Sequence, residues 1–181
     1  MTCYNIIKER DKGEKEMRYN KVNGNRFYKA IKANMDNNPF VEVKNIEDYN
    51  KMVCILAEDE LSGLAIDNGD IVSVYNASDR RGELNRLMPI AIQNGGMKLD
   101  NFEGKLSEIY ARYGFVRVAE CSFSKEFAPE GWDFETFGQP NIEFQILKSK
   151  VQEVEVKIFD DYDMAGQYRD NAIREEMLQR V

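Results

Sequence analysis

The spacing of apolar residues changes several times along the chain, and each change marks a new element. Alternating apolar and polar residues indicate strands, whereas apolar residues three or four positions apart indicate helices with one buried face. The pattern predicts strands over residues 40–43, 62–67, 70–76, 97–102, 116–123, 141–148 and 151–159. It predicts helices over residues 26–35, 83–94, 103–113 and 164–179. Strands and helices mixed in this way are typical of an α+β domain.

Residues that favour turns or interrupt helices mark several of these boundaries. Asn68-Gly69 lies between two apolar runs, which is a strong hairpin signal because both residues tolerate a positive φ. Gly114 follows the predicted helix 103–113, at a position where the left-handed conformation commonly ends a helix. Pro89 lies inside the predicted helix 83–94 and removes a backbone donor, so we expect a kink or a break there.

Residues 46–57 fit two interpretations. Asn45 is a good cap for a helix that places Tyr49, Val53 and Leu56 on one face, whereas residues 52–56 equally fit a buried strand. The sequence leaves both interpretations open.

The two ends of the chain are more polar than its middle. Residues 1–25 are rich in charge and predict a loosely ordered lead-in, with a short strand at 4–7. We expect one folded domain over residues 26–160 and a surface helix over residues 161–181.

Composition narrows the class of protein. With 43% hydrophobic and 11% aromatic residues, the 181-residue chain can fill a core, and it has no apolar run long enough to cross a bilayer. The first residues lack the pattern of a signal peptide. Cys3, Cys54 and Cys121 are odd in number and widely spaced, so we expect no disulfide framework and a reducing cytoplasm.

Two further features exclude or disfavour functions. The chain has no histidine, which excludes Ser-His-Asp and Cys-His catalysis and removes the usual zinc ligands. The formal net charge of −7 disfavours a duplex nucleic acid partner and suits a cationic or amine-bearing substrate.

Residues 106–120 read as a helix that stops at a glycine and turns directly into a strand. Apolar residues recur at helical spacing at Leu106, Ile109, Tyr110 and Tyr113, before Gly114-Phe115. A tyrosine in the last turn, four residues before Gly-Phe, resembles the second half of the GNAT acyltransferase fold. The order of hairpin, loop, helix, strand, helix, strand, loop and strand over residues 62–147 also resembles the core of that family, over about half the chain.

The resemblance implies a GNAT-like mixed, mostly antiparallel sheet with helices on both faces. It also implies a V-shaped gap between the strand at 70–76 and the strand at 97–101, which takes the pantetheine arm of acetyl-CoA. The residues assigned to this arm are Val74, Tyr75, Asn76 and Asn101, with Asp100 as the alternative to Asn101.

The resemblance places the pyrophosphate at the N-terminus of the next helix, where unpaired amides and the helix dipole favour an anion. The residues that fall on this phosphate loop are Ser78, Arg80, Arg81 and Gly82. The family's loop reads Arg/Gln-x-x-Gly-x-Gly/Ala, and this chain departs from it. Leu84 replaces the second small residue, and Glu83 brings an anion beside the phosphate or else stabilises the helix N-terminus.

In the family, the tyrosine that corresponds to Tyr110 protonates the departing thiolate or positions the thioester, so the resemblance makes Tyr110 the catalytic residue. Trp132, the single tryptophan, and Glu120 are assigned to the substrate side. Trp132 also fits a structural role that pins its loop to the core. No metal ligands are identified. The candidates for a general base are Glu58, Asp59, Glu60, Glu120, Asp133 or an ordered water.

The leading hypothesis is a cytoplasmic N-acyltransferase in which an amine attacks acetyl-CoA directly. The amine is carried by a small molecule or a protein, and backbone amide of the strand at 70–76 binds the developing oxyanion. The alternative is a GNAT-fold protein without catalysis, a binding or inhibitory protein such as a phage or prophage accessory protein. An unrelated α+β domain is a third option, and a homodimer is left open.

Overall fold

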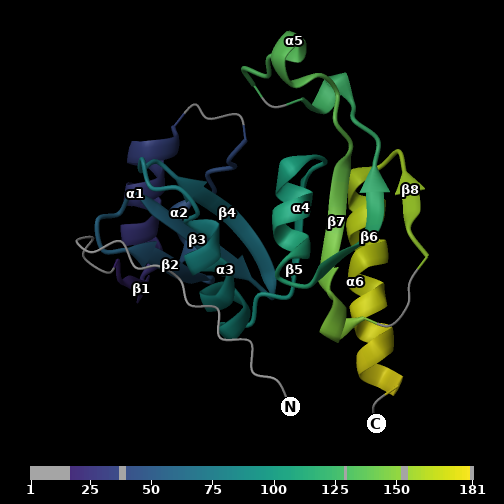
Figure 1. The fold of residues 1–181 in the computed structure, drawn as a ribbon, viewed down its shortest axis with the longest axis horizontal. Helices are drawn as coiled ribbons and strands as arrows, with labels where there is room; N and C mark the ends of the chain where they lie inside the picture. Colours follow the sequence, from purple (N-terminus) through teal and green to yellow (C-terminus); the bar gives the residue numbers. More distant parts are fainter. Residues whose placement is uncertain (1–16, 37–39, 129, 152–154, 180–181) are drawn as a thin grey trace, which may run out of the picture.

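The computed structural model describes residues 17–36, 40–128, 130–151 and 155–179 (Figure 1). Within these residues, eight strands form one sheet in the order β1-β2-β3-β4-β5-β7-β6-β8. The strands are β1 Tyr19–Val22, β2 Val53–Ala57, β3 Ser62–Asp67, β4 Asp70–Asn76, β5 Lys98–Phe102, β6 Phe115–Cys121, β7 Ile142–Leu147 and β8 Lys157–Phe159. Only the β4–β5 and β6–β8 pairs are parallel, so the predicted mixed, mostly antiparallel sheet is confirmed.

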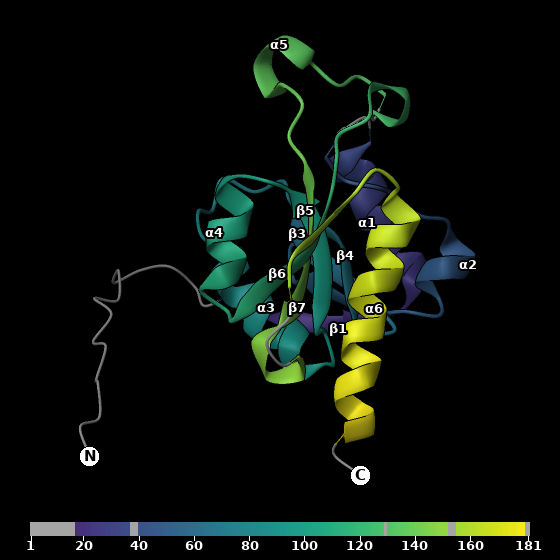
Figure 2. The same ribbon diagram turned by 90° about the vertical axis from the view of Figure 1, so that its right-hand side faces the viewer.

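Helices cover both faces of this sheet. The α-helices are α1 Gly24–Met35, α2 Ile46–Tyr49, α3 Leu84–Gln93, α4 Lys105–Ala111, α5 Phe134–Phe137 and α6 Tyr162–Gln179. In Figure 2, α4 lies on one side of the sheet and α1 and α6 lie on the other. The core follows the same division. Leu87 and Tyr110 pack on one face against Ile55 and Leu99, while Phe27 of α1 packs on the opposite face.

The sheet is split between β4 and β5. These two strands are paired at a single position, Asp70 with Lys98, and then diverge along their length (Figure 1). The register of β4 against β3 also shifts between Gly63 and Ala65, which places a bulge at Ser73, whose φ is 50°. A bulge of this kind bends the strand and leaves part of the ladder unpaired. The expected V-shaped gap is therefore present, with a distorted strand on one side.

Local signals account for several element boundaries. Asn68 and Gly69 form the hairpin turn between β3 and β4, with φ values of 47° and 85°. Gly114 has a φ of 87° and ends the turn after α4 as predicted. In the ambiguous residues 46–57, the strand interpretation is confirmed, with Val53 and Leu56 in β2, and the helix covers only residues 46–49. The Asn45 side chain accepts from the Asp48 amide and caps the one-turn helix α2, which is followed by β2.

Some expectations differ from the structure. Residues 40–43 are not a strand, and of the predicted strand 151–159 only Lys157–Phe159 is one, among the described residues. The expected strand at 4–7 lies outside the described residues. Helix α3 runs through Pro89 unbroken. Proline removes only one hydrogen bond, and Pro89 is exposed while Leu87 and Met88 on the other side remain packed in the core.

The two polar ends take a larger part in the domain than the sequence predicts. Residues 19–22, placed in the lead-in, form β1 and pair with β2 along its length. Helix α6, expected on the surface, packs against β6 and β7 and buries Ala165, Arg169 and Ile173. The face that packs carries Ala165, Tyr168, Ala172 and Ile173 at helical spacing, but two of these are alanines and the buried Arg169 lies among them, so the apolar stripe is weak in the sequence. No described helix is both long and apolar enough to span a bilayer.

Candidate functional site

A cavity of about 990 Å³ opens where β4 and β5 separate. Val72, Ser73 and Val74 of β4 line one side, and Asp100 and Asn101 of β5 line the other. Successive residues of a strand point to opposite faces of a sheet, so the two walls offer side chains toward both α4 and α6. The cavity therefore connects the two faces of the split sheet.

Tyr110 of α4 reaches this cavity from one face. Its side chain is 5% exposed and packs edge-on against Phe115, and no described residue is a hydrogen-bond partner of its hydroxyl. Among the described side chains, no fully buried polar atom lacks a partner, so the Tyr110 hydroxyl is open to the cavity. Burial, with a contribution from the charge of Asp100, raises the pKa of Tyr110 to about 12. Tyr110 is thus a protonated donor at neutral pH.

Four charged side chains meet on the opposite face, where β4 and β5 join. The Arg169 guanidinium lies 2.7 Å from Asp70 and 3.0 Å from Asp170, and the Lys98 ammonium lies 2.8 Å from Asp170. Burial raises the pKa of Asp70, although Arg169 and Lys98 oppose that effect. This network ties α6 to the vertex of the gap.

Asp100 lies next to this network but is less well compensated. The nearest cationic atom is Arg169 Nη1 at 4.0 Å, and Arg169 makes its shorter contacts to other carboxylates. Burial and the neighbouring charge of Asp70 raise the pKa of Asp100. The Tyr162 hydroxyl of α6 faces the same carboxylate, and burial together with Asp100 raises the pKa of Tyr162. Asp100 is thus a carboxylate in the cavity wall with spare capacity for a cation.

The predicted phosphate loop has a different internal structure from the expected one. Glu83 is 2% exposed, and its carboxylate accepts hydrogen bonds from Ser62 at 2.6 Å, Tyr19 at 2.7 Å and Arg80 at 3.1 Å. Burial alone would raise the pKa of Glu83, but these hydrogen bonds lower it. Arg80 also pairs with Asp59. The Glu83 carboxylate therefore points into the domain. It pairs with Arg80, one of the two arginines that the resemblance assigns to the phosphate.

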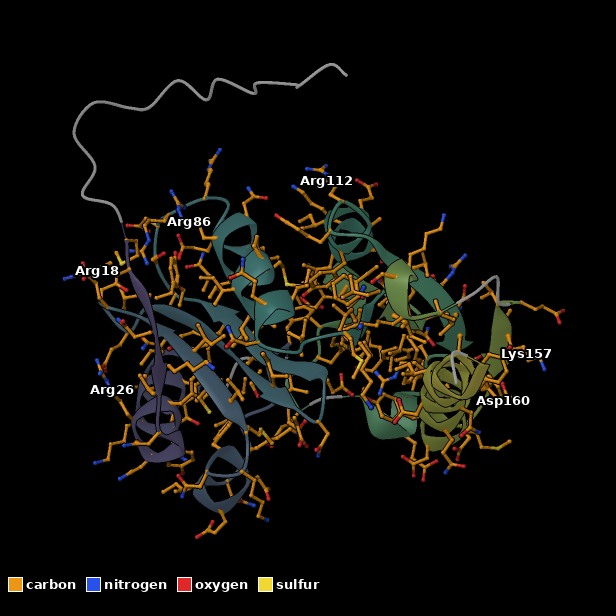
Figure 3. All side chains as sticks on the ribbon, turned by 90° about the horizontal axis from the view of Figure 1, so that it is seen from below. Arg18, Arg26, Arg86, Arg112, Lys157 and Asp160 are labelled. Atoms are coloured by element: carbon orange, nitrogen blue, oxygen red, sulfur yellow. The ribbon has the colours of Figure 1, made fainter. Side chains whose placement is uncertain are left out.

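A fourth donor to Glu83 comes from α3. Arg86 of α3 donates to Glu83 at 3.2 Å. Viewed from below in Figure 3, Arg86 lies on the same half of the molecule as Arg18 and Arg26, and Arg112 and Lys157 lie on the other half. Glu83 is thus the centre of an ion cluster that joins β1, β3 and α3.

The backbone N–H groups of the predicted phosphate loop remain free to bind an anion. Among the described residues, the N–H groups of residues 81–84 have no hydrogen-bond acceptor, as is usual in the first turn of a helix. Arg81 and Gly82 are exposed, and Gly82 has a φ of 74°. Four amides and the N-terminal end of the ten-residue helix α3 can therefore hold an anion.

The other residues assigned to the cofactor divide into two groups. Val74 and Asn101 line the cavity, and the Asn101 amide is fixed by Ser107 and Gln145. The cavity lining does not include Tyr75, Asn76, Ser78, Arg80, Arg81 or Gly82. The bulge turns Tyr75 into the core under α1, where its hydroxyl donates to the Glu60 carbonyl at 2.9 Å. Asn76 accepts hydrogen bonds from Ser78 and shapes the loop.

Of the two residues predicted on the substrate side, one lines the cavity and the other does not. Trp132 lines the cavity, and its indole N–H donates to the Gly138 carbonyl at 3.1 Å, so it both pins its loop and forms a wall. Glu120 does not line the cavity. It lies on β6 opposite Glu143 and pairs with Arg117, because strand pairing directs it away from the gap.

Sequence reasoning missed Tyr162 and Arg169 as residues of the cavity wall. Arg169 and its partner Asp70 are 99 residues apart, and neither belongs to a motif. A buried arginine on a polar helix gives no periodic signal, so only the three-dimensional structure identifies it.

No protein-family model matches the chain, and no curated protein matches it. The structure aligns with solved acetyltransferases. An IAA acetyltransferase from Bacillus cereus ATCC 14579 is 14% identical, with a TM-score of 0.50 over 72% of this chain and 99% of that one. A GNAT-family acetyltransferase from Streptococcus pneumoniae is 12% identical, with a TM-score of 0.50 over 72% of this chain and 98% of that one.

A diaminobutyrate acetyltransferase from Paenibacillus lautus, in complex with its substrate and coenzyme A, is 11% identical, with a TM-score of 0.48 over 78% of this chain and all of that one (100%). The split between β4 and β5, the helices on both faces and the two alignments at a TM-score of 0.50 agree with one another. The chain therefore has the fold of the GNAT acetyltransferases, carried by a divergent sequence.

Proposed function

We propose that the protein is a cytoplasmic N-acyltransferase that moves an acetyl group from acetyl-CoA to an amine. The observation that carries this proposal is the Tyr110 hydroxyl, which is open to the cavity between β4 and β5 and has no partner among the described residues. A buried, protonated phenol without a partner is suited to give its proton to a leaving group.

The residues present fit coenzyme A in two places. The free amides of residues 81–84 and the exposed Arg81 suit the pyrophosphate, and the diverging backbones of β4 and β5 suit the pantetheine arm. Acetyl-CoA, when bound, supplies a thioester whose carbonyl carbon accepts the amine nitrogen as the carbon–sulfur bond breaks.

The chain's own residues then hold and supply protons. Tyr110 gives one proton to the sulfur, and the nitrogen loses one proton to a base, so the exchange balances. The bulge at Ser73 interrupts the β3–β4 ladder beside the cavity, so backbone amide of β4 is suited to polarise a carbonyl there.

The test pairs two tyrosines of one segment. We expect Tyr110→Phe to bind acetyl-CoA as the wild type does in calorimetry but to lose turnover by roughly 10²- to 10⁴-fold, the usual contribution of a general acid. Tyr113→Phe is the matched control, because Tyr113 donates to Asn85 away from the cavity, and it should keep its turnover. Unchanged turnover in Tyr110→Phe would remove Tyr110 from the mechanism.

One observation favours the alternative, a GNAT-fold binding or inhibitory protein without catalysis. Arg80 is engaged by Asp59 and Glu83, which weakens the cationic part of the phosphate loop. If millimolar acetyl-CoA gives neither heat nor a thermal shift, this alternative replaces the enzyme.

A further inference from the structure

We propose that the acceptor is a positively charged amine attached to an aromatic group by a short chain, with its ammonium on Asp100 and its ring on an aromatic wall. The aromatic wall consists of Phe40, Phe102, Trp132 and Phe137. This inference rests on the proposed function, and it names the substrate class of the same cavity.

The aromatic wall is a contiguous apolar surface of the cavity. Its ring centroids are close together, at 4.7 Å for Phe102 and Trp132, 4.6 Å for Phe40 and Phe137, and 5.2 Å for Phe40 and Trp132. All four side chains line the cavity, and Phe40 and Phe137 are 49% and 40% exposed. Exposed aromatic rings in one group mark a surface that takes another apolar group.

The wall offers no polar group that would select a polar ligand. The indole N–H of Trp132, which is its one donor, is already bonded to the Gly138 carbonyl at 3.1 Å. The other three members are phenylalanines. An aromatic ring is therefore a better occupant of this end of the cavity than a sugar or a polar peptide side chain.

The charges beside the wall favour a cation. On the α6 face of the cavity, each basic group has a carboxylate partner: Lys44 lies 2.7 Å from Glu42, Lys98 lies 2.8 Å from Asp170, and Arg169 lies 2.7 Å from Asp70. Asp100 accepts a hydrogen bond from the Tyr162 hydroxyl, and among the described residues its one contact with a basic group is the 4.0 Å contact to Arg169. An ammonium at Asp100 would compensate a half-buried carboxylate. A ligand carboxylate would face Asp100 and Asp70 on a side of the cavity where the described basic groups are already paired, and Lys105, the remaining basic residue of the lining, belongs to α4.

The spacing of the two subsites sets the length of the linker. Asp100 and Phe102 are two residues apart on β5, so their side chains share one face and are about 7 Å apart along the strand. A chain of about two carbons between nitrogen and ring spans this distance. Asp100 and Tyr110 line the same cavity, which connects the two faces of the split sheet, so the nitrogen subsite and the proposed proton donor share one space.

Trp132 is the only tryptophan of the chain, so its fluorescence reports directly on occupation of the wall. We would titrate the full chain, without acetyl-CoA, with four probes. These are 2-phenylethylamine, 3-phenylpropionate as the anion of matched length, ethylamine as the amine without a ring, and phenylalanine. We expect saturable binding of 2-phenylethylamine, and at least tenfold weaker binding of the other three.

Variants test the two subsites separately. Asp100→Asn should weaken the binding of 2-phenylethylamine at least tenfold, and so should Phe137→Ala, which truncates an exposed ring and preserves the core. Asp163→Asn is the matched control, because Asp163 is exposed on α6 and does not line the cavity, and its affinity should be unchanged.

Equal binding of 3-phenylpropionate, unchanged affinity in both cavity variants, or no saturable binding would overturn the inference. This failure is distinguishable from failure of the proposed function, because the titration needs no thioester. If acetyl-CoA binds and ethylamine is acetylated as well as 2-phenylethylamine, the proposed function stands and the inference fails. If the amine binds as expected and no acetyl transfer occurs, the subsites stand and the enzyme activity fails.

Discussion

At the scale of single residues, the same side chain has different consequences depending on where it points. Glu83 reads in the sequence as an anion next to a phosphate site, and in the structure it is a buried acceptor for Ser62, Tyr19 and Arg80. Its effect on the loop is therefore indirect. It holds the loop and α3 against β1 and β3, and it leaves the backbone amides in front of the helix free.

Replacing Glu83 should therefore lower the free energy of unfolding. We expect Glu83→Ala to cost about 3 kcal/mol, because the buried Ser62 and three partly buried donors, Tyr19, Arg80 and Arg86, lose a charged acceptor. Hydrogen bonds hold the pKa of Glu83 below its ordinary value, so this contribution is present at neutral pH and is lost as the pH falls through that lowered pKa. Urea denaturation at several pH values measures it.

Glu108→Gln is the control for this measurement, since Glu108 is exposed on α4. It should change the free energy of unfolding by less than about 0.5 kcal/mol. An equally small effect of Glu83→Ala would show that the buried cluster contributes little to stability.

At the scale of elements, α6 closes the vertex of the split sheet. The parallel pair β4–β5 is held by one backbone position, Asp70 with Lys98, and Arg169 and Asp170 of α6 bind those same two side chains. A mostly polar helix is thus held by buried charges together with a narrow apolar stripe of Ala165, Tyr168, Ala172 and Ile173.

Removing the arginine should loosen this junction. We expect Arg169→Met to lower the free energy of unfolding by about 3 kcal/mol, because the mostly buried Asp70 is left with Lys98, at 3.9 Å, as its basic partner. Amide hydrogen exchange should then be faster in α6 and at the start of β4 and β5. In a double-mutant cycle, adding Asp70→Asn should cost less than in the wild type, and purely additive effects would contradict a direct coupling.

At the scale of the whole molecule, buried tyrosines make the stability of the fold depend on pH in the alkaline range. Burial raises the pKa of Tyr75 and Tyr110, in the cores on opposite faces of the sheet, and also that of Tyr19 and Tyr162. In each case the folded protein keeps a proton that the unfolded chain releases near pH ~10. Stability from these groups is complete below that pH and is lost as the pH rises through the folded pKa values.

We therefore expect the free energy of unfolding to fall above pH ~10, by about 1.4 kcal/mol per pH unit for Tyr110 alone until its folded pKa is reached. Ultraviolet absorbance of tyrosinate, compared with circular dichroism at each pH, tests this. The buried tyrosines should ionise together with loss of the fold. Reversible ionisation of all tyrosines near pH ~10 with the fold intact would contradict it.

Elements with local signals are encoded in short stretches of the chain. Asn68-Gly69 specifies a hairpin because both residues accept a positive φ, and Gly114 ends the segment after α4 for the same reason. Tyr110 was assigned from its place before Gly-Phe, and the structure brings it to the cavity. These features depend on residues that are neighbours along the chain.

Which side chains meet in the cavity, and which turn away from it, depends on the packing of elements that are far apart in the sequence. Arg169 pairs with Asp70, which is 99 positions away in the sequence. Glu83 points into the domain because it accepts hydrogen bonds from Tyr19 of β1 and Ser62 of β3. The bulge in β4 turns Tyr75 into the core. Burial and charge pairing act between groups that are distant in the sequence, so a local pattern of apolar and polar residues does not predict these contacts.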